Sequence, residues 1–124
     1  GLTLGSPISM LIVNRDFITG KGPDGVPWTD EMISMAWKHE NVFIGVDAYA
    51  PKHWPPQIVH YLNTYGQDKV LFGTDWPVID PERAVREIED MDIRPEAMPL
   101  LMRENALRVF RLPESPSDDH RTAR

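Results

Sequence analysis

The sequence predicts an α/β fold built of about three parallel strands with helices between them. Three observations support this prediction. Short apolar stretches alternate with longer stretches of helical periodicity, and one strand with its helix takes about 25 to 30 residues. The apolar stretches also lack the polar alternation of a half-exposed strand. This pattern is typical of parallel strands that are covered by helices.

Length and composition limit the classes of protein that fit. The 124 residues suffice for one domain, and 41% hydrophobic with 26% charged residues are typical of a globular protein. The formal net charge of -6 argues against nucleic acid and anionic membranes as partners, because both attract clustered lysine and arginine. No apolar run approaches the roughly 20 residues of a membrane-spanning helix. The chain has no cysteine, which fits a reducing compartment, and we therefore expect a cytoplasmic protein.

The first half of the chain predicts two strands and one helix. Residues 8–13 (ISMLIV) form a short apolar strand, and residues 14–26 form a glycine-rich loop. Thr29 is expected to cap a helix that ends near His39 and has two acidic residues in its first turn. Residues 41–46 (NVFIGV) form the second strand.

The middle of the chain predicts a helix and the third strand. A loop at 47–54 leads into a helix that begins at two prolines and ends at Gly66. Residues 69–73 (KVLFG) form the third strand. The apolar face of the helix consists of four residues at helical spacing: Ile58, Val59, Leu62 and Tyr65.

The last third of the chain predicts two helices and a tail. Asp80 and Pro81 suit the N-cap and the first position of a helix, whose outer face carries two oppositely charged i,i+4 pairs. A helical stretch over residues 95–110 is expected to bend or restart at Pro99. Residues 113–124 are rich in Pro, Ser, Asp and Arg and predict a disordered tail.

Residues 69–80 (KVLFGTDWPVID) carry the main candidate for a functional residue. The apolar run stops at Gly73, and Asp75 follows as a lone carboxylate before Pro77. Ligands bind at the carboxyl ends of parallel strands, because loops and helix N-termini converge there. We therefore expect the third strand to deliver Asp75 to a binding site. The alternative is that its carboxylate caps a local turn.

The loop after the second strand should open onto the same face as Asp75, because both loops follow carboxyl ends of parallel strands. It contributes Asp47, Tyr49 and His53. His53 is a candidate for contact with a substrate or for proton transfer, and the alternative is a solvated loop histidine. Trp76 is either a packing residue or an aromatic at the rim of a site.

The remaining polar residues have structural interpretations. His39 suits a helix end, His60 lies off the apolar face of its helix, and His120 lies in the tail. The glycines of residues 20–25 lack the spacing of a phosphate-binding loop. Asn105 lies on an apolar stripe, where we expect a buried and hydrogen-bonded side chain.

A parallel sheet of this kind occurs either in an open doubly wound fold or in a (β/α)8 barrel. Three strands are few for either, and a barrel takes about 250 residues. A three-stranded piece would have two unpaired edges and an uncovered apolar face. Because the chain starts at Gly1 in a loop-like stretch, we expect further sequence upstream.

Several motifs together resemble one known family. They are PWTDEM (27–32), NVFIGVDAYAPKHWPPQIV (41–59), LFGTDWP (71–77) and RENALRVF (103–110). With them the chain resembles the C-terminal part of an amidohydrolase-2 protein, a family of the metal-dependent hydrolase superfamily that includes the aminocarboxymuconate-semialdehyde decarboxylase type. The resemblance covers residues 28–112 well and is poor before residue 28.

The resemblance implies a distorted TIM barrel with a divalent metal, zinc or alternatively manganese. The family holds its metal with a His-x-His pair on the first strand, often a mid-barrel histidine, and an aspartate at the end of the last strand, which corresponds to Asp75. A carboxylate beside a metal-bound water also suits the role of proton acceptor. This sequence has no His-x-His pair. Residues 16–28 (DFITGKGPDGVPW) also lack the histidine that family members commonly carry there.

The sequence therefore predicts a partial barrel domain over residues 1–112, from the C-terminal part of a metal-dependent amidohydrolase. The parent enzyme would hydrolyse C–N or C–O bonds of a small organic substrate, or perform a related decarboxylation, and this part alone is expected to be inactive. Asp75 is the expected catalytic and metal-binding residue, and His53 and Trp76 are expected to contact substrate. The alternative is a non-catalytic interaction module that forms a homo-oligomer through its open sheet edges. An open-sheet nucleotide-binding domain ranks last, because no phosphate-binding motif is present.

Overall fold

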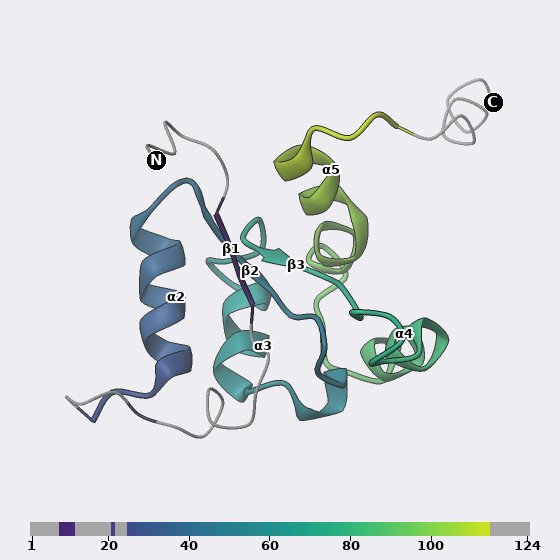
Figure 1. Cartoon of the computed structure of the whole chain (residues 1–124), viewed down its shortest axis with the longest axis horizontal. Coiled ribbons are helices and arrows are strands. Elements are labelled where there is room, and N and C mark those ends of the chain that lie inside the picture. Colours follow the sequence, from purple (N-terminus) through teal and green to yellow (C-terminus); the bar gives the residue numbers. More distant parts are fainter. Residues whose placement is uncertain (1–7, 12–20, 22–24, 115–124) are drawn as a thin grey trace.

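The computed structural model describes residues 8–11, 21 and 25–114. The predicted tail beyond residue 114, most of the loop at 14–26, the glycines before Gly25 and His120 lie outside this part of the chain. None of the helices in the described part is long and apolar enough to span a membrane. Figure 1 shows the elements, whose bounds are β1 (Ile8–Leu11), α2 (Trp28–Lys38), β2 (Val42–Gly45), the 3₁₀ helix η1 (Pro51–His53), α3 (Pro56–Asn63), β3 (Val70–Leu71), α4 (Pro81–Glu89), the π-helix η2 (Leu100–Glu104) and α5 (Asn105–Phe110).

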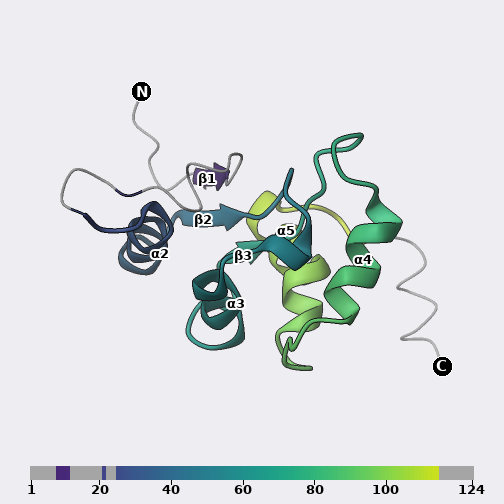
Figure 2. The same cartoon turned by 90° about the horizontal axis from the view of Figure 1, so that it is seen from below.

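The three strands form one parallel sheet in chain order, β1-β2-β3. β2 lies in the centre, with Ile8 opposite Val42 on one side and Ile44 opposite Val70 on the other. Figure 2 shows α2 and α3 on the same side of this sheet. An open doubly wound sheet has helices on both faces, whereas a (β/α) barrel winds in one direction with its helices outside. The described part therefore has the winding of a barrel segment, as predicted.

The hydrophobic core lies between the sheet and its helices, with α2 and α3 supplying much of it and Ile88 of α4 and Leu101 of η2 joining it. Ile44 of β2 and Val70 of β3 are fully buried, as expected for neighbours on one face of a sheet. Tyr61 is the largest fully buried side chain and comes from α3. The other members of the core from these two helices are Met32, Ile33, Ala36, Ile58 and Leu62.

The start of α2 differs from the expected Thr29 cap. Pro27 occupies the N-cap position, and its carbonyl accepts hydrogen bonds from the N–H groups of Asp30 and Glu31. Thr29 lies inside the first turn and is fully buried. The prediction was wrong because proline's fixed φ already preorganises the chain before Trp28, so the helix begins two residues earlier than expected.

The apolar face of α3 also differs in part from the prediction. The helix ends at Asn63 rather than at Gly66, so Tyr65 lies beyond it and is 54% exposed. Tyr61 takes the expected place in the core. The N–H of Gly66 donates to the carbonyl of Tyr61, which closes the turn after the helix. The expected surface position of His60 is confirmed.

The helix α4 begins as predicted. The Asp80 carboxylate accepts a hydrogen bond from the N–H of Arg83 at 3.0 Å, and Pro81 is the first helical residue. Both expected charged pairs are present, Arg83 with Glu87 and Arg86 with Glu82. The predicted restart at Pro99 is confirmed as well, because Pro99 is the N-cap of η2.

The outer edge of β3 is occupied by the C-terminal helical segment. Carbonyls of Lys69 and Leu71 face β2, where they accept hydrogen bonds from the N–H groups of Ile44 and Val46. The backbone groups of the alternate residues, Val70 and Phe72, face away from β2. The N–H of Phe72 donates to the carbonyl of Leu101, and the side-chain amide of Asn105 donates to the carbonyl of Val70. The expectation of an open edge was therefore wrong at β3, which is also shorter than the predicted 69–73.

Candidate active site

The carboxyl ends of β2 and β3 lie side by side. Gly45 is the register partner of Leu71, and the N–H of Val46 donates to the Leu71 carbonyl at 3.1 Å. Two residues further along, Asp47 and Gly73 are in close approach. A Cβ atom on Gly73 would lie 2.9 Å from the Cβ of Asp47. The absence of a side chain at Gly73 thus allows Asp47 to stand at the tip of β3.

Gly73→Ala is expected to destabilise the fold by about 1 to 3 kcal/mol, the usual range for overpacking at a site that cannot expand freely. The added methyl group would press on Asp47 Cβ, which is fixed to the backbone. Urea unfolding measured by circular dichroism checks the effect. Thr74→Ala is the matched control, because it changes the next residue without adding atoms. Equal unfolding midpoints for Gly73→Ala and the parent chain would show that the strand ends do not approach this closely.

Strained backbone occurs at the same two strand ends. Ala48 has φ of 63° and Asp75 has φ of 54°. Non-glycine residues adopt such angles uncommonly, aspartate more readily than alanine, and residues held in them cluster at functional sites. Arg111, the third such residue in the described part, is a helix C-cap, where this conformation is ordinary. The strain at Ala48 and Asp75 therefore supports a functional role for this edge of the sheet.

Asp75 is exposed at the end of β3. The turn that follows is closed by its main chain, since the N–H of Val78 donates to the Asp75 carbonyl oxygen at 2.8 Å. Within the described part, no hydrogen bond or ion pair engages the Asp75 carboxylate. The local-turn alternative for this carboxylate is therefore not what the structure shows.

The other candidates lie on the loop after β2 and in the turn after β3. His53 is the last residue of η1, is exposed, and has its ring 6.0 Å from that of Tyr49. Trp76 is 67% exposed. Among the described residues, no hydrogen bond or ring contact joins either of them to Asp75. The structure thus brings Asp47 to the β3 tip, and roles in substrate contact for His53 and Trp76 stay predictions.

The metal-ligand set is incomplete in the described part of the chain. No group of three or more His, Asp or Glu side chains there is arranged to hold a metal ion. Asp75 offers a hard oxygen ligand, which suits zinc, manganese or magnesium. One carboxylate does not hold a catalytic zinc ion alone, because such sites take three protein ligands. The described residues therefore do not form a metal site by themselves.

A groove of about 930 Å³ lies at the opposite, amino edge of the sheet. It is lined by Asn41 and Phe43 at β2 and by Lys69 before β3. The Lys69 ammonium donates to the carbonyls of His39, Glu40 and Val42 at 2.9, 3.0 and 3.1 Å. Burial lowers the pKa of Lys69 below its usual value. These bonds tie the turn after α2 to β3, which is a structural role, so we place the candidate site at the carboxyl edge.

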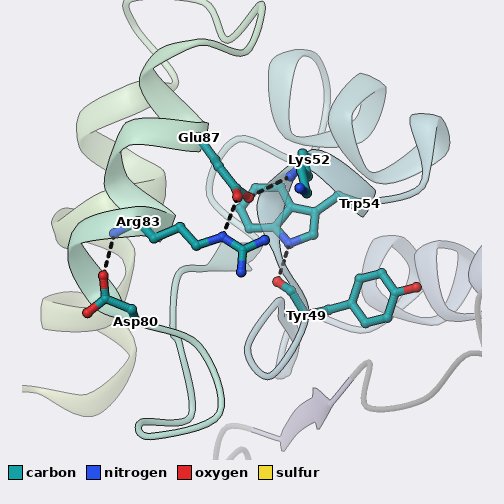
Figure 3. Close-up of polar contacts among 6 residues, drawn as sticks. All are labelled: Tyr49, Lys52, Trp54, Asp80, Arg83 and Glu87. Carbon is teal, nitrogen blue, oxygen red and sulfur yellow. Dashed lines mark hydrogen bonds and ion pairs between the residues drawn. The ribbon is translucent and has the colours of Figure 1, made fainter.

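Sequence reasoning missed one polar cluster near the candidate site. Glu87 of α4 binds both Arg83 on its own helix and the backbone of Lys52 in η1 (Figure 3). The sequence shows only an i,i+4 pair at this position, and the same pattern recurs at Glu82 and Arg86. No signal in the sequence separates the two pairs, because the contact with Lys52 joins segments 35 residues apart.

Comparisons with known proteins support the barrel topology. The family model described as amidohydrolase matches residues 19–112. Among solved structures, an uncharacterised TIM-barrel protein from Bordetella bronchiseptica is similar, with a TM-score of 0.67 and 21% sequence identity. The match covers 86% of this chain and 46% of that protein, so the chain spans about half the length of this structural relative. No curated protein matches the sequence.

The structural likeness concerns the fold, which is a segment of a TIM-type barrel with parallel strands and helices. The family match runs from before α2 to just beyond α5, and it includes both strand ends of the candidate site. With most of the described residues inside that match, the chain belongs to the amidohydrolase family.

Proposed function

We propose that the chain is the C-terminal part of a metal-dependent amidohydrolase, in which Asp75 is the metal ligand and proton acceptor that this part contributes. One observation carries the proposal. Asp75 stands at the carboxyl end of β3 in a strained conformation, with a carboxylate that no hydrogen bond or ion pair in the described part engages. A carboxylate held in this way is poised to bind a ligand rather than to stabilise its own turn.

The reaction class follows from the family. A divalent metal, zinc or manganese, supplies an activated water when bound in such a barrel. The substrate would be a small organic molecule with a C–N or C–O bond to be hydrolysed, or one to be decarboxylated, as in the aminocarboxymuconate-semialdehyde decarboxylase type. His53 and Trp76 are the residues we assign to substrate contact. Because the described residues lack a complete ligand set, we propose that this part is inactive alone.

The metal content of the purified chain tests the role of Asp75. The chain and its Asp75→Asn variant are exposed to zinc and to manganese, passed through gel filtration and measured by plasma mass spectrometry. Asp92→Asn is the matched control, because it removes an exposed carboxylate beyond the C-terminus of α4, beside the end of α3. If this part assembles a site within or between chains, we expect near-stoichiometric metal that is lost in Asp75→Asn and kept in Asp92→Asn.

A chain that retains no metal would place the remaining ligands outside this sequence. The same substitution is then made in a longer protein that includes them. There Asp75→Asn is expected to abolish metal-dependent turnover, because a neutral amide is a poor ligand and accepts no proton. Turnover that is unchanged in that variant would refute the assignment of Asp75.

The second candidate is the interaction module that self-associates through its sheet edges. At the outer edge of β3, the carbonyl of Val70 accepts a hydrogen bond from Asn105 and the N–H of Phe72 donates to Leu101, so self-association of this kind would use the edge of β1. Homo-oligomer formation stays a prediction and is measured by light scattering.

A further inference from the structure

We infer that Glu87 is a positioning residue that docks the loop at 47–54 on α4 and so fixes this loop relative to the Asp75 turn. The inference rests on the proposed function only in treating these two loops as parts of one site. Its structural content is a link between the segment after β2 and the segment after β3. Figure 3 shows the residues of this link.

Both carboxylate oxygens of Glu87 are engaged. Oε1 accepts a hydrogen bond from Arg83 Nε at 2.7 Å, and Oε2 accepts one from the backbone N–H of Lys52 at 3.2 Å. The Glu87 side chain is 16% exposed, so these bonds are partly shielded from water. The Lys52 N–H belongs to the first turn of η1, where backbone donors have no partner within the helix. Glu87 therefore supplies to η1 the cap that its own sequence lacks.

The loop that carries Lys52 is internally braced. The indole Nε1 of Trp54 donates to the carbonyl of Tyr49 at 3.1 Å, and the N–H of His53 donates to the carbonyl of Ala50 at 2.8 Å. Two residues of the loop itself, Pro51 and Trp54, are buried. Because the loop is held as a unit, the attachment at Lys52 also acts on the positions of His53 and Tyr49.

The other end of the link lies at Asp80, two residues after the Asp75 turn in the chain. Arg83, which holds Glu87 through its side chain, donates its backbone N–H to the Asp80 carboxylate. Asp80 caps α4 and follows the turn closed between Asp75 and Val78. A continuous set of hydrogen bonds thus runs from the start of α4 through Arg83 and Glu87 to Lys52.

Charge strengthens the link. Burial acts to raise the pKa of Glu87, but hydrogen bonds from Arg83 and the Lys52 amide, together with the charges of both residues, lower it below its usual value. Arg83 faces Glu87 from the same helix and Lys52 faces it from η1. The carboxylate is therefore ionised at neutral pH, where its hydrogen bonds are of the stronger, charge-assisted kind.

The chain contains a matched control on the same helix. Glu82 and Arg86 form a pair with the same i,i+4 spacing, and their side chains are 80% and 64% exposed. No hydrogen bond in the described part joins Glu82 to another element. Removing Glu82 therefore deletes an equivalent charge and an equivalent helix pair, and leaves the loop attachment in place.

Amide hydrogen exchange at Lys52, followed by NMR, is the direct test. Glu87→Ala is expected to speed the exchange of this amide by about tenfold to a hundredfold, the change that corresponds to loss of one charged hydrogen bond. Glu87→Gln keeps the shape and one acceptor, so it should show a smaller increase. Glu82→Ala should leave the exchange unchanged. Equal exchange in all four proteins, or equal acceleration by Glu87→Ala and Glu82→Ala, would overturn the inference.

A second measurement separates positioning from simple stabilisation. The chain has no cysteine, so a double variant with Lys52→Cys and Val78→Cys carries spin labels at two positions only, one on η1 and one in the Asp75 turn. The distance distribution between the labels is expected to be narrow in the labelled parent chain and with Glu82→Ala. With Glu87→Ala it is expected to broaden, while the far-ultraviolet circular dichroism spectrum stays unchanged. An unchanged distribution with Glu87→Ala would overturn the positioning role. Both measurements are independent of metal, so failure of the Asp75 assignment would leave them unaffected.

Discussion

Tyr61→Ala is expected to lower the unfolding free energy by about 3 to 5 kcal/mol, the range for removing a fully buried aromatic ring. Tyr61 has no exposed surface and is the largest fully buried side chain in the described part. The ring of Tyr65 lies 4.7 Å from it at a steep angle, and the backbone of Gly66 lies against its edge. A loss of this size would take a large share of the roughly 5 to 15 kcal/mol that stabilises a small domain.

Tyr61→Phe is the control for this prediction. The Tyr61 hydroxyl has no hydrogen-bond partner among the described residues, and burial, with Asp68 and Tyr65 nearby, raises its pKa to about 12. Removing such a hydroxyl while keeping the ring is expected to change stability by less than about 1 kcal/mol or to increase it. Urea unfolding at neutral pH measures both variants. Similar losses for alanine and phenylalanine would show that the hydroxyl, not the packing of the ring, stabilises the core.

Asn105→Leu is expected to cost about 2 to 4 kcal/mol, because it leaves buried carbonyl groups without donors. The Asn105 side chain is fully buried, and its amide donates to the carbonyls of Gln67 and Val70 at 2.7 and 2.9 Å. Leucine has a similar volume, so the loss reports the hydrogen bonds rather than a cavity. The same change also removes one of the contacts that cover the outer edge of β3.

Thermal and urea unfolding of Asn105→Leu, with Glu104→Ala as control, measure this loss. Glu104 is the preceding residue and is exposed. Its carboxylate forms an ion pair with the neighbouring Arg103. Its replacement should alter stability by no more than about 0.5 kcal/mol. If Asn105→Leu were as stable as the control, the buried amide would not be what attaches α5 to β3.

The parts of the fold that the sequence predicted are those determined by neighbouring residues. The cap of α4 depends only on Asp80 and the three residues after it, and the restart at Pro99 depends on proline itself. The predicted end of α3 was wrong, because the position of this helix end depends on tertiary contacts. Tyr61 fills the core and the helix stops at Asn63, which carries the fourth expected core residue, Tyr65, onto the surface.

The candidate site divides in the same way. The position of Asp75 at a strand end follows from an apolar run and a proline, which are local signals. The close approach of Asp47 to Gly73 depends on the register between β2 and β3, and the sequence does not contain that register explicitly. The attachment of Lys52 to Glu87 joins distant segments and was not foreseen. The sequence does not predict a complete metal-ligand set, because it contains no His-x-His pair.

The cover on the outer edge of β3 has a consequence for synthesis on the ribosome. Ile44 precedes Val70, so β3 can pair with β2 as soon as it emerges. Asn105 follows Val70 by 35 residues, so the groups on the other edge have no partner until most of α4 and η2 has been translated. During that interval the nascent chain presents a short row of unpaired backbone groups beside apolar residues, which is a template for association with other chains.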